Sequence, residues 1–125
     1  MKSDFKLASE QIQQQGKNPV TVFHLHGWLD AQSEEQLLTA AQEAHSAGAR
    51  HLVLEMTEVE TLTSAGMRAI QKVHRLFTPD QNINSAHMKL CNAPPLVYHV
   101  LGLTGFLQTM PMYESLQAAL DSYTV

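Results

Sequence analysis

Apolar and polar residues alternate over the first thirty positions, and this alternation predicts two strands joined by a loop. The segment from Phe5 to Ile12 fits a weak edge strand, and the polar stretch after it contains Gly16, which suits a hairpin loop. Residues 19–30, PVTVFHLHGWLD, are rich in β-branched and aromatic side chains and give the stronger strand signal. One face of this strand carries Phe23, Leu25 and Leu29, and the other carries Val20, Val22, His24, His26 and Trp28.

Helical spacing begins after the second strand. Ser33 and Gln36 have the spacing of a capping box, so we expect a helix to begin at Ser33. Apolar residues then recur on one helical face, and Gly48 is expected to end the helix. This face consists of Leu37, Leu38, Ala41, Ala44 and Ala47.

Strand-like and helical segments continue to alternate toward the C-terminus. The apolar run HLVLEM, residues 51–56, predicts a short buried parallel strand. A second amphipathic helix is expected from Ser64 to Phe77, ended by Pro79. The remaining segments are a strand at 87–93, a helix from Pro95 with apolar Leu96, Val97, Val100 and Leu101, a short strand at 109–113, and a helix at 114–122.

The order of these segments predicts the fold class. Strands that alternate with helices form βαβ units with right-handed crossovers. We therefore expect an α/β fold with a mixed, mostly parallel sheet of about five strands, about four helices, and an antiparallel hairpin at the start. The chain has 125 residues without a repeat or linker-like tract, so residues 1–125 are expected to form a single domain.

Composition and charge narrow the possible functions. Apolar residues make up 44% of the chain and charged residues 16%, which is typical of a globular protein rather than a disordered one. Eight Lys and Arg residues against twelve Asp and Glu residues give a formal net charge of −4, and the basic residues form no patch along the sequence. A nucleic-acid partner is therefore not expected.

Neither export nor membrane insertion is indicated. The first ten residues lack the apolar core of a signal peptide, and no apolar run approaches the roughly 20 residues that span a bilayer. Cys91 is the single cysteine, and the alternating run around it favours a packing role over a nucleophilic one. We expect a soluble cytoplasmic protein.

No catalytic or cofactor-binding motif stands out, so we expect a protein that is not an enzyme and needs no cofactor. The chain has no phosphate-binding glycine loop, no G-x-S-x-G and no zinc-finger spacing of Cys and His. Seven histidines leave one alternative open. His24 and His26 share a strand face, and a neighbouring strand could add His51 to make a metal or small-ligand site.

The segment TLTSAGMRAI, residues 61–70, places hydroxyl and small residues where the second helix begins. Thr63 or Ser64 can cap the helix by accepting a hydrogen bond from a free backbone N–H, and we expect Ser64 to contribute to the cap. A cap does not explain Gly66, because glycine inside a helix costs about 1 kcal/mol relative to alanine. Either close approach by a partner or tight packing on the sheet could require the glycine.

The longer segment LVLEMTEVETLTSAGMRAI resembles the STAS domains, the bacterial anti-sigma factor antagonists. In that family an apolar strand ending in Leu-Asp-Leu is followed by a loop with a valine and then by Asp-Ser-Ser-Gly-Leu. The matching residues here are Leu54, Glu55, Met56, Val59, Ser64, Gly66 and Met67. GWLD at residues 27–30 and VLGLTGF at residues 100–106 are similar to two further family segments, so the resemblance covers nearly the whole chain.

What the resemblance implies is a regulatory domain that switches between partners. Family members bind an anti-sigma factor that is also a serine kinase, phosphorylation ends the complex, and a phosphatase restores it. Ser64 matches the phosphorylated serine, and Asp30 matches a family aspartate near that site. The implied partner-binding residues are Asp30, Thr63, Ser64, Ala65, Gly66 and Met67, with Gly66 allowing close approach and Met67 supplying apolar contact.

Two positions depart from the family pattern. Thr63 stands where the family has the aspartate before the phosphoserine, and Ala65 stands where it has the second serine. Loss of the carboxylate changes what a kinase would recognise, so Thr63 is an alternative phosphorylation site. The same departure leaves open a second function, a STAS subunit of a transport or signalling assembly that is not phosphorylated.

Overall fold

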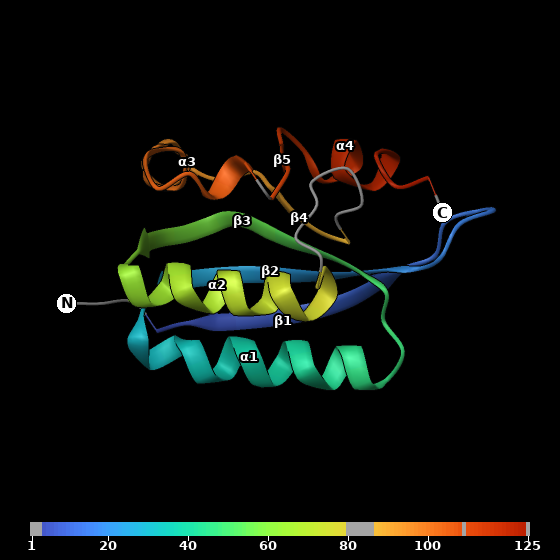
Figure 1. Cartoon of the computed structure of the whole chain (residues 1–125), viewed down its shortest axis with the longest axis horizontal. Coiled ribbons are helices and arrows are strands. Elements are labelled where there is room, and N and C mark those ends of the chain that lie inside the picture. The colour runs from blue at the N-terminus through green and yellow to red at the C-terminus, as the bar shows by residue number, and fades with distance from the viewer. Residues whose placement is uncertain (1–3, 80–86, 109, 125) are drawn as a thin grey trace.

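The computed structural model describes residues 4–79, 87–108 and 110–124, and within them the chain forms a five-stranded sheet packed against helices (Figure 1). The strand order is β1-β2-β3-β4-β5, with β1 antiparallel to β2 and the other neighbours parallel. The strands are β1 (Lys6–Ile12), β2 (Val20–Leu29), β3 (His51–Leu62), β4 (Met88–Cys91) and β5 (Met112–Tyr113). The helices are α1 (Ala31–Ser46), α2 (Ser64–Phe77), α3 (Pro95–Leu103) and α4 (Leu116–Asp121), with a 3₁₀ turn at Phe106–Gln108. The expected α/β class and the N-terminal hairpin are confirmed.

Different helices pack on the two faces of the sheet. The main core joins one face of β2 and β3 to α1, α2 and α3, and it contains the apolar face of β2 predicted from the alternation. Fully buried members include Phe23, Leu25, Leu29, Leu54, Met56 and Ile70. On the opposite face, α4 covers the beginnings of β2 and β3, where Val20, Val22 and Val53 are buried. Farther along β2 on that face, His24, His26 and Trp28 are only half-buried.

β3 is longer than the sequence predicted. It contains 12 residues, His51–Leu62, whereas the apolar run covers only residues 51–56. The second half is polar, with Glu58 and Glu60 exposed, so no hydrophobic pattern marks it. Pairing with the long β2, where His26 lies opposite Glu58, extends the strand. The added length carries β3 to the point where α2 begins.

α1 begins earlier than expected. Its cap is Asp30, and the capping box is formed by Asp30 and Ser33 instead of Ser33 and Gln36. The Asp30 carboxylate accepts hydrogen bonds from the N–H groups of Gln32 and Ser33 at 3.0 and 3.2 Å. In return, the Ser33 hydroxyl accepts the Asp30 N–H at 2.8 Å. A capping side chain must lie where the chain is still extended, and β2 ends at the residue before Asp30.

The remaining elements follow the predicted order with shorter bounds. α2 spans the predicted residues, whereas the last strand is only Met112–Tyr113 and the last helix is Leu116–Asp121. Thr109, part of the predicted last strand, lies outside the described residues. Leu96, which the sequence pattern places among the apolar residues of α3, is 77% exposed. In the part of the chain that the structure describes, no helix is both long enough and apolar enough to cross a membrane.

Candidate functional site

The carboxyl ends of β2 and β3 lie side by side and bring the predicted site residues together. Leu29 pairs with Leu62, and the N–H of Thr63 donates to the Leu29 carbonyl at 3.1 Å. α1 and α2 therefore begin at the same end of the molecule, the first capped by Asp30 and the second by Thr63 (Figure 1).

Thr63 alone provides the side-chain cap of α2. Its backbone is extended, with φ −98° and ψ 174°, and its Oγ1 accepts the N–H of Gly66 at 3.3 Å. Ser64 is already the first helical residue and is exposed. The expectation that Ser64 contributes to the cap is wrong, because the capping side chain belongs to the residue before the helical backbone. The Ser64 hydroxyl is instead presented at the surface, beside the positive end of the helix dipole.

Gly66 faces the sheet. A β-carbon built on Gly66 would lie 2.0 Å from the Leu29 carbonyl oxygen and 3.0 Å from Leu62 Cδ1. No real β-carbon tolerates the first of these distances, so only glycine lets α2 approach the backbone of β2 this closely. Because Gly66 is buried by its own chain, packing on the sheet accounts for the glycine, and close approach by a partner is not needed to explain it.

The exposed part of the first turn is small. Ser64 is exposed, while Thr63, Ala65 and Met67 are half-buried, with Met67 packed against the edge of the main core. Asp30 is 8% exposed and directs its carboxylate to the start of α1. The surface that a partner could touch here therefore centres on Ser64, with Ala65 and Met67 beside it.

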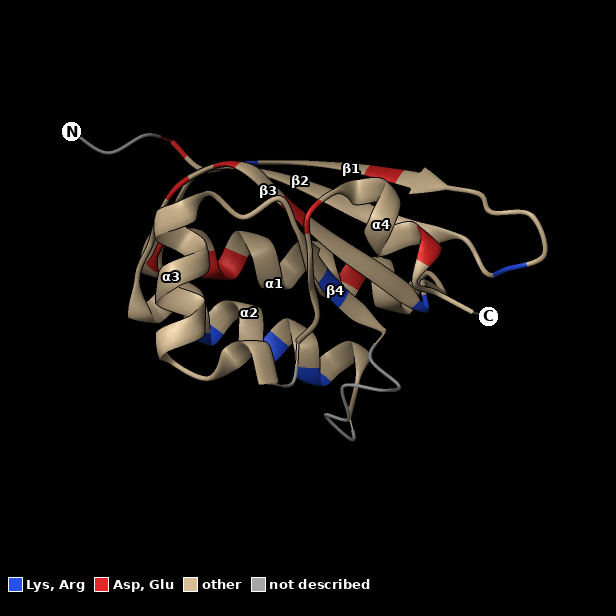
Figure 2. Cartoon of the chain, turned by 90° about the horizontal axis from the view of Figure 1, so that it is seen from above, with Lys and Arg blue, Asp and Glu red and all other residues tan. Residues whose placement is uncertain are grey.

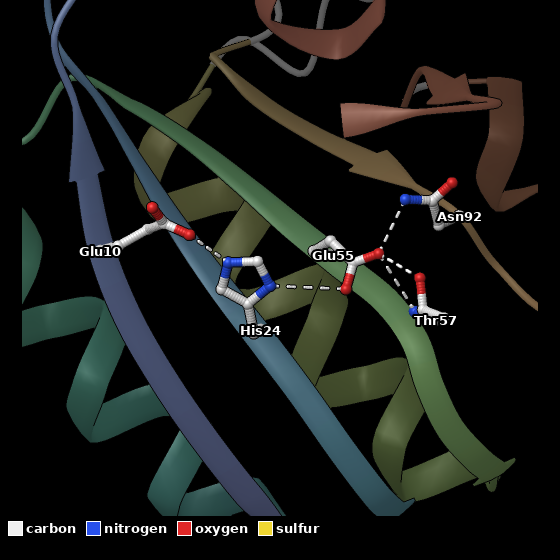
Figure 3. A network of polar contacts seen from close by, with 5 residues as sticks. All are labelled: Glu10, His24, Glu55, Thr57 and Asn92. Carbon is white, nitrogen blue, oxygen red and sulfur yellow. Dashed lines mark hydrogen bonds and ion pairs between the residues drawn. The ribbon is translucent and has the colours of Figure 1, made fainter. Parts of the chain in front are cut away.

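A polar network crosses the sheet on the face opposite the main core (Figure 3). His24 on β2 lies between two carboxylates: its Nε2 contacts Glu10 of β1, and its Nδ1 is 3.5 Å from Glu55 Oε1 on β3. The Thr57 hydroxyl and the Asn92 amide donate to Glu55 Oε2, the latter at 2.8 Å. Sequence reasoning missed this network because it joins four separate segments of the chain that share no motif spacing.

The environment of Glu55 favours its charged form. Burial by itself raises the pKa of the carboxyl group, but hydrogen bonds from Thr57 and Asn92, together with His24, outweigh that effect and lower the pKa below its usual value. Glu55 therefore remains a carboxylate at neutral pH. It links β3 to His24 of β2 and, through a charge-assisted hydrogen bond, to Asn92, the residue after β4.

The alternative site of three histidines is not assembled. His24 and His26 share a face of β2, but His51 pairs with Val20, four residues before His24 and about 13 Å away along the strand. His51 is buried and stacks on Tyr123, with ring centroids 4.2 Å apart. Within residues 4–79, 87–108 and 110–124, no group of three His, Cys, Asp or Glu side chains is placed to hold a metal ion.

Cys91 is a buried packing residue. Burial, together with the nearby Glu55 charge, raises the pKa of the Cys91 thiol to about 12. The thiol is therefore protonated at neutral pH and lacks the thiolate character of a nucleophile.

Comparison with known proteins identifies the family. The STAS domain family model matches residues 11–119. The chain belongs to the STAS domain family. The matched residues include the ends of β2 and β3 and the whole of α2, so the Ser64 turn lies within the part of the chain that matches the STAS domain.

Several STAS proteins are similar over nearly the whole chain. An anti-sigma F factor antagonist of Paenibacillus polymyxa is 25% identical over 116 residues, which cover 92% of this chain and 96% of the relative. The crystal structure of an anti-sigma factor antagonist from Mycobacterium paratuberculosis superposes with a TM-score of 0.78 at 21% identity, covering 95% of this chain and 93% of that one. The structure of the Bacillus cell fate determinant SpoIIAA in its phosphorylated form superposes with a TM-score of 0.63 at 18% identity. The match covers 91% of this chain and 97% of that one. These structures share the STAS fold with this chain.

Proposed function

We propose that this STAS domain is a cytoplasmic bacterial anti-sigma factor antagonist, a regulatory protein that acts by binding an anti-sigma factor and not by catalysis. Its membership of the STAS family supports this function. So does the alignment with the Paenibacillus antagonist, which covers 96% of that relative. The partner is a serine kinase, and a phosphatase reverses its action.

The observation that carries the proposal is the exposed Ser64 at the start of α2, beside a cap supplied by another residue. In the proposed switch, the kinase transfers the γ-phosphoryl group of ATP to Ser64 Oγ, with release of ADP and the hydroxyl proton. The phosphate adds a charge of about −1.5 to −2. The free N–H groups and dipole at the helix start tolerate such a charge, so the fold is retained. The bulk and charge of the phosphate then prevent a partner from contacting the turn around Met67.

Thr63 is a poorer site for the same modification. Its Oγ1 accepts the Gly66 N–H, and the residue is half-buried. Phosphorylation of Thr63 would disturb the cap, whereas phosphorylation of Ser64 would leave it in place.

The proposed partner-binding residues then have two kinds of role. Ser64, Ala65 and Met67 contact the partner, because they carry the accessible surface of the turn. Asp30, Thr63 and Gly66 hold that surface in position, through the caps of α1 and α2 and the packing of α2 on Leu29.

The test uses a histidine-kinase-like ATPase of the anti-sigma factor class, taken from the organism that encodes this chain. The two proteins are incubated with ATP, and phosphate is mapped by mass spectrometry in the parent chain, in Ser64→Ala and in Thr63→Val. We expect phosphate on Ser64 in the parent and in Thr63→Val, and none on this turn in Ser64→Ala.

Two results would contradict the proposal in different ways. A stable complex without phosphate on Ser64 or Thr63 would remove the switch. It would favour a STAS subunit of a transport or signalling assembly, a function to which Thr63 in place of the family aspartate lends weight. Absence of any complex with the ATPase would remove the antagonist function itself.

A further inference from the structure

Three basic side chains line up with Ser64 on the exposed face of α2. Arg68, Lys72 and Arg75 are all exposed and follow Ser64 at intervals of four, four and three residues. This spacing keeps them on one side of an α-helix, opposite the buried face that includes Ala69, Ile70 and Val73. We call the four residues the α2 stripe; it is about 16 Å long.

The α2 stripe stands out against the charge of the whole chain. The net charge is −4, yet α2 contains no Asp or Glu and three of the eight Lys and Arg residues. Figure 2 shows these positions following one another along α2, with acidic positions on the neighbouring α1. The sequence suggested no basic patch, because these residues are separated in the chain and only the helix gathers them.

One carboxylate partly offsets the α2 stripe. Lys72 Nζ donates to Glu34 Oε2 of α1 at 2.7 Å. This hydrogen bond, with the charges of Lys72 and Arg68, lowers the pKa of Glu34, so Glu34 is negative at neutral pH. The three cations of the α2 stripe and the Glu34 carboxylate together carry an excess of two positive charges.

We infer that the α2 stripe is a docking surface for an acidic face of the anti-sigma factor, and that Ser64 is its charge switch. The inference rests on the function proposed above and adds the chemistry of the partner. Complementary charge steers association and suppresses partners of the wrong sign. A phosphate of about −1.5 to −2 at Ser64 cancels the excess of two positive charges at one end of the stripe. The α2 stripe thus gives phosphorylation an electrostatic effect on affinity that does not depend on the family aspartate missing at position 63.

The test measures the affinity of the same ATPase for charge variants of the unphosphorylated chain by isothermal titration calorimetry in low and high salt. Arg75→Glu and Arg75→Gln change the end of the α2 stripe far from the proposed Ser64 contact. Lys6→Glu is the matched control, because Lys6 is exposed on the edge strand β1 and pairs with His26 on the sheet face opposite α2. Circular dichroism of each variant verifies that it is folded.

We expect the dissociation constant in low salt to rise about tenfold in Arg75→Glu, by less in Arg75→Gln, and by less than about twofold in Lys6→Glu. The parent should also lose affinity in high salt, because salt screens exposed charges. Equal affinities of the parent, Arg75→Glu and Lys6→Glu would overturn the docking inference and leave the antagonist function standing. No binding by the folded parent would overturn both.

Discussion

The Thr63 hydroxyl accepts the N–H of Gly66, while the hydroxyl of Ser64, one residue later, is exposed. At the scale of single residues, the start of α2 thus places the capping hydroxyl and the hydroxyl proposed for phosphorylation on adjacent residues. Gly66 completes the arrangement by letting the turn rest on the Leu29 carbonyl. A modification of Ser64 can therefore change the surface while the cap and the packing stay intact.

This division predicts unequal stability effects for two neighbouring alanine substitutions. Thr63→Ala should lower the free energy of unfolding by about 1 kcal/mol, because an N-cap hydrogen bond is lost. Ser64→Ala should change it by no more than about 0.5 kcal/mol, as is usual for an exposed residue without a capping role. Urea denaturation of both variants measures the difference. An equal or larger loss in Ser64→Ala would mean that Ser64 carries the cap.

The packing of Gly66 predicts a larger effect for one added methyl group. Gly66→Ala should destabilise the protein by about 2 kcal/mol or more, because the new β-carbon meets the backbone of β2 at 2.0 Å and the helix must shift. Gly102→Ala is the matched control on α3, where a β-carbon meets nothing within 4 Å. That control should be neutral or slightly stabilising, since alanine favours the helix. Similar thermal midpoints for the two variants would refute the close packing of α2 on Leu29.

At the scale of elements, the sequence predicted what a local pattern specifies. The bounds of α2 were predicted because a strong amphipathic pattern runs between Thr63 and a proline-terminated end. The start of α1 was misplaced because two capping boxes overlap at Ser33, and the choice between them depends on where β2 ends. The second half of β3 could not be predicted, because its polar residues form a strand only through pairing with β2.

The same long-range pairing assembles the network around Glu55 and predicts a pH dependence. A carboxyl group whose pKa is lowered by folding contributes stability above its unfolded pKa and loses it as the pH falls through the folded value. The free energy of unfolding should therefore fall as the pH drops below 4.5, the ordinary pKa of a glutamate side chain. In Glu55→Gln this decrease should be smaller. Chemical denaturation of both proteins between about pH 3 and pH 7 measures the free energy of unfolding against pH. If this free energy falls equally in the parent and in Glu55→Gln, Glu55 does not contribute to the pH dependence.

At the scale of the whole molecule, an acidic STAS domain presents one basic helix face, and that face begins at the residue proposed for modification. The family resemblance located Ser64, since its motif is local in the chain. It could not show that Thr63 forms the cap, that Gly66 is buried, or that Arg68, Lys72 and Arg75 share a face with Ser64. Each of these depends on the path of α2 over the sheet, which no segment of the sequence specifies alone.

The most direct test of the phosphorylation switch is the affinity of the anti-sigma factor ATPase for two forms of this chain. One form is unmodified, and the other carries phosphoserine at position 64, installed by genetic code expansion. Both forms should show the same circular dichroism, because the cap on Thr63 is retained. The unmodified chain should bind, and the phosphoserine form should bind at least about a hundredfold more weakly, a difference of about 2.7 kcal/mol. Equal affinities for the two folded forms would contradict the claim that Ser64 is the switch.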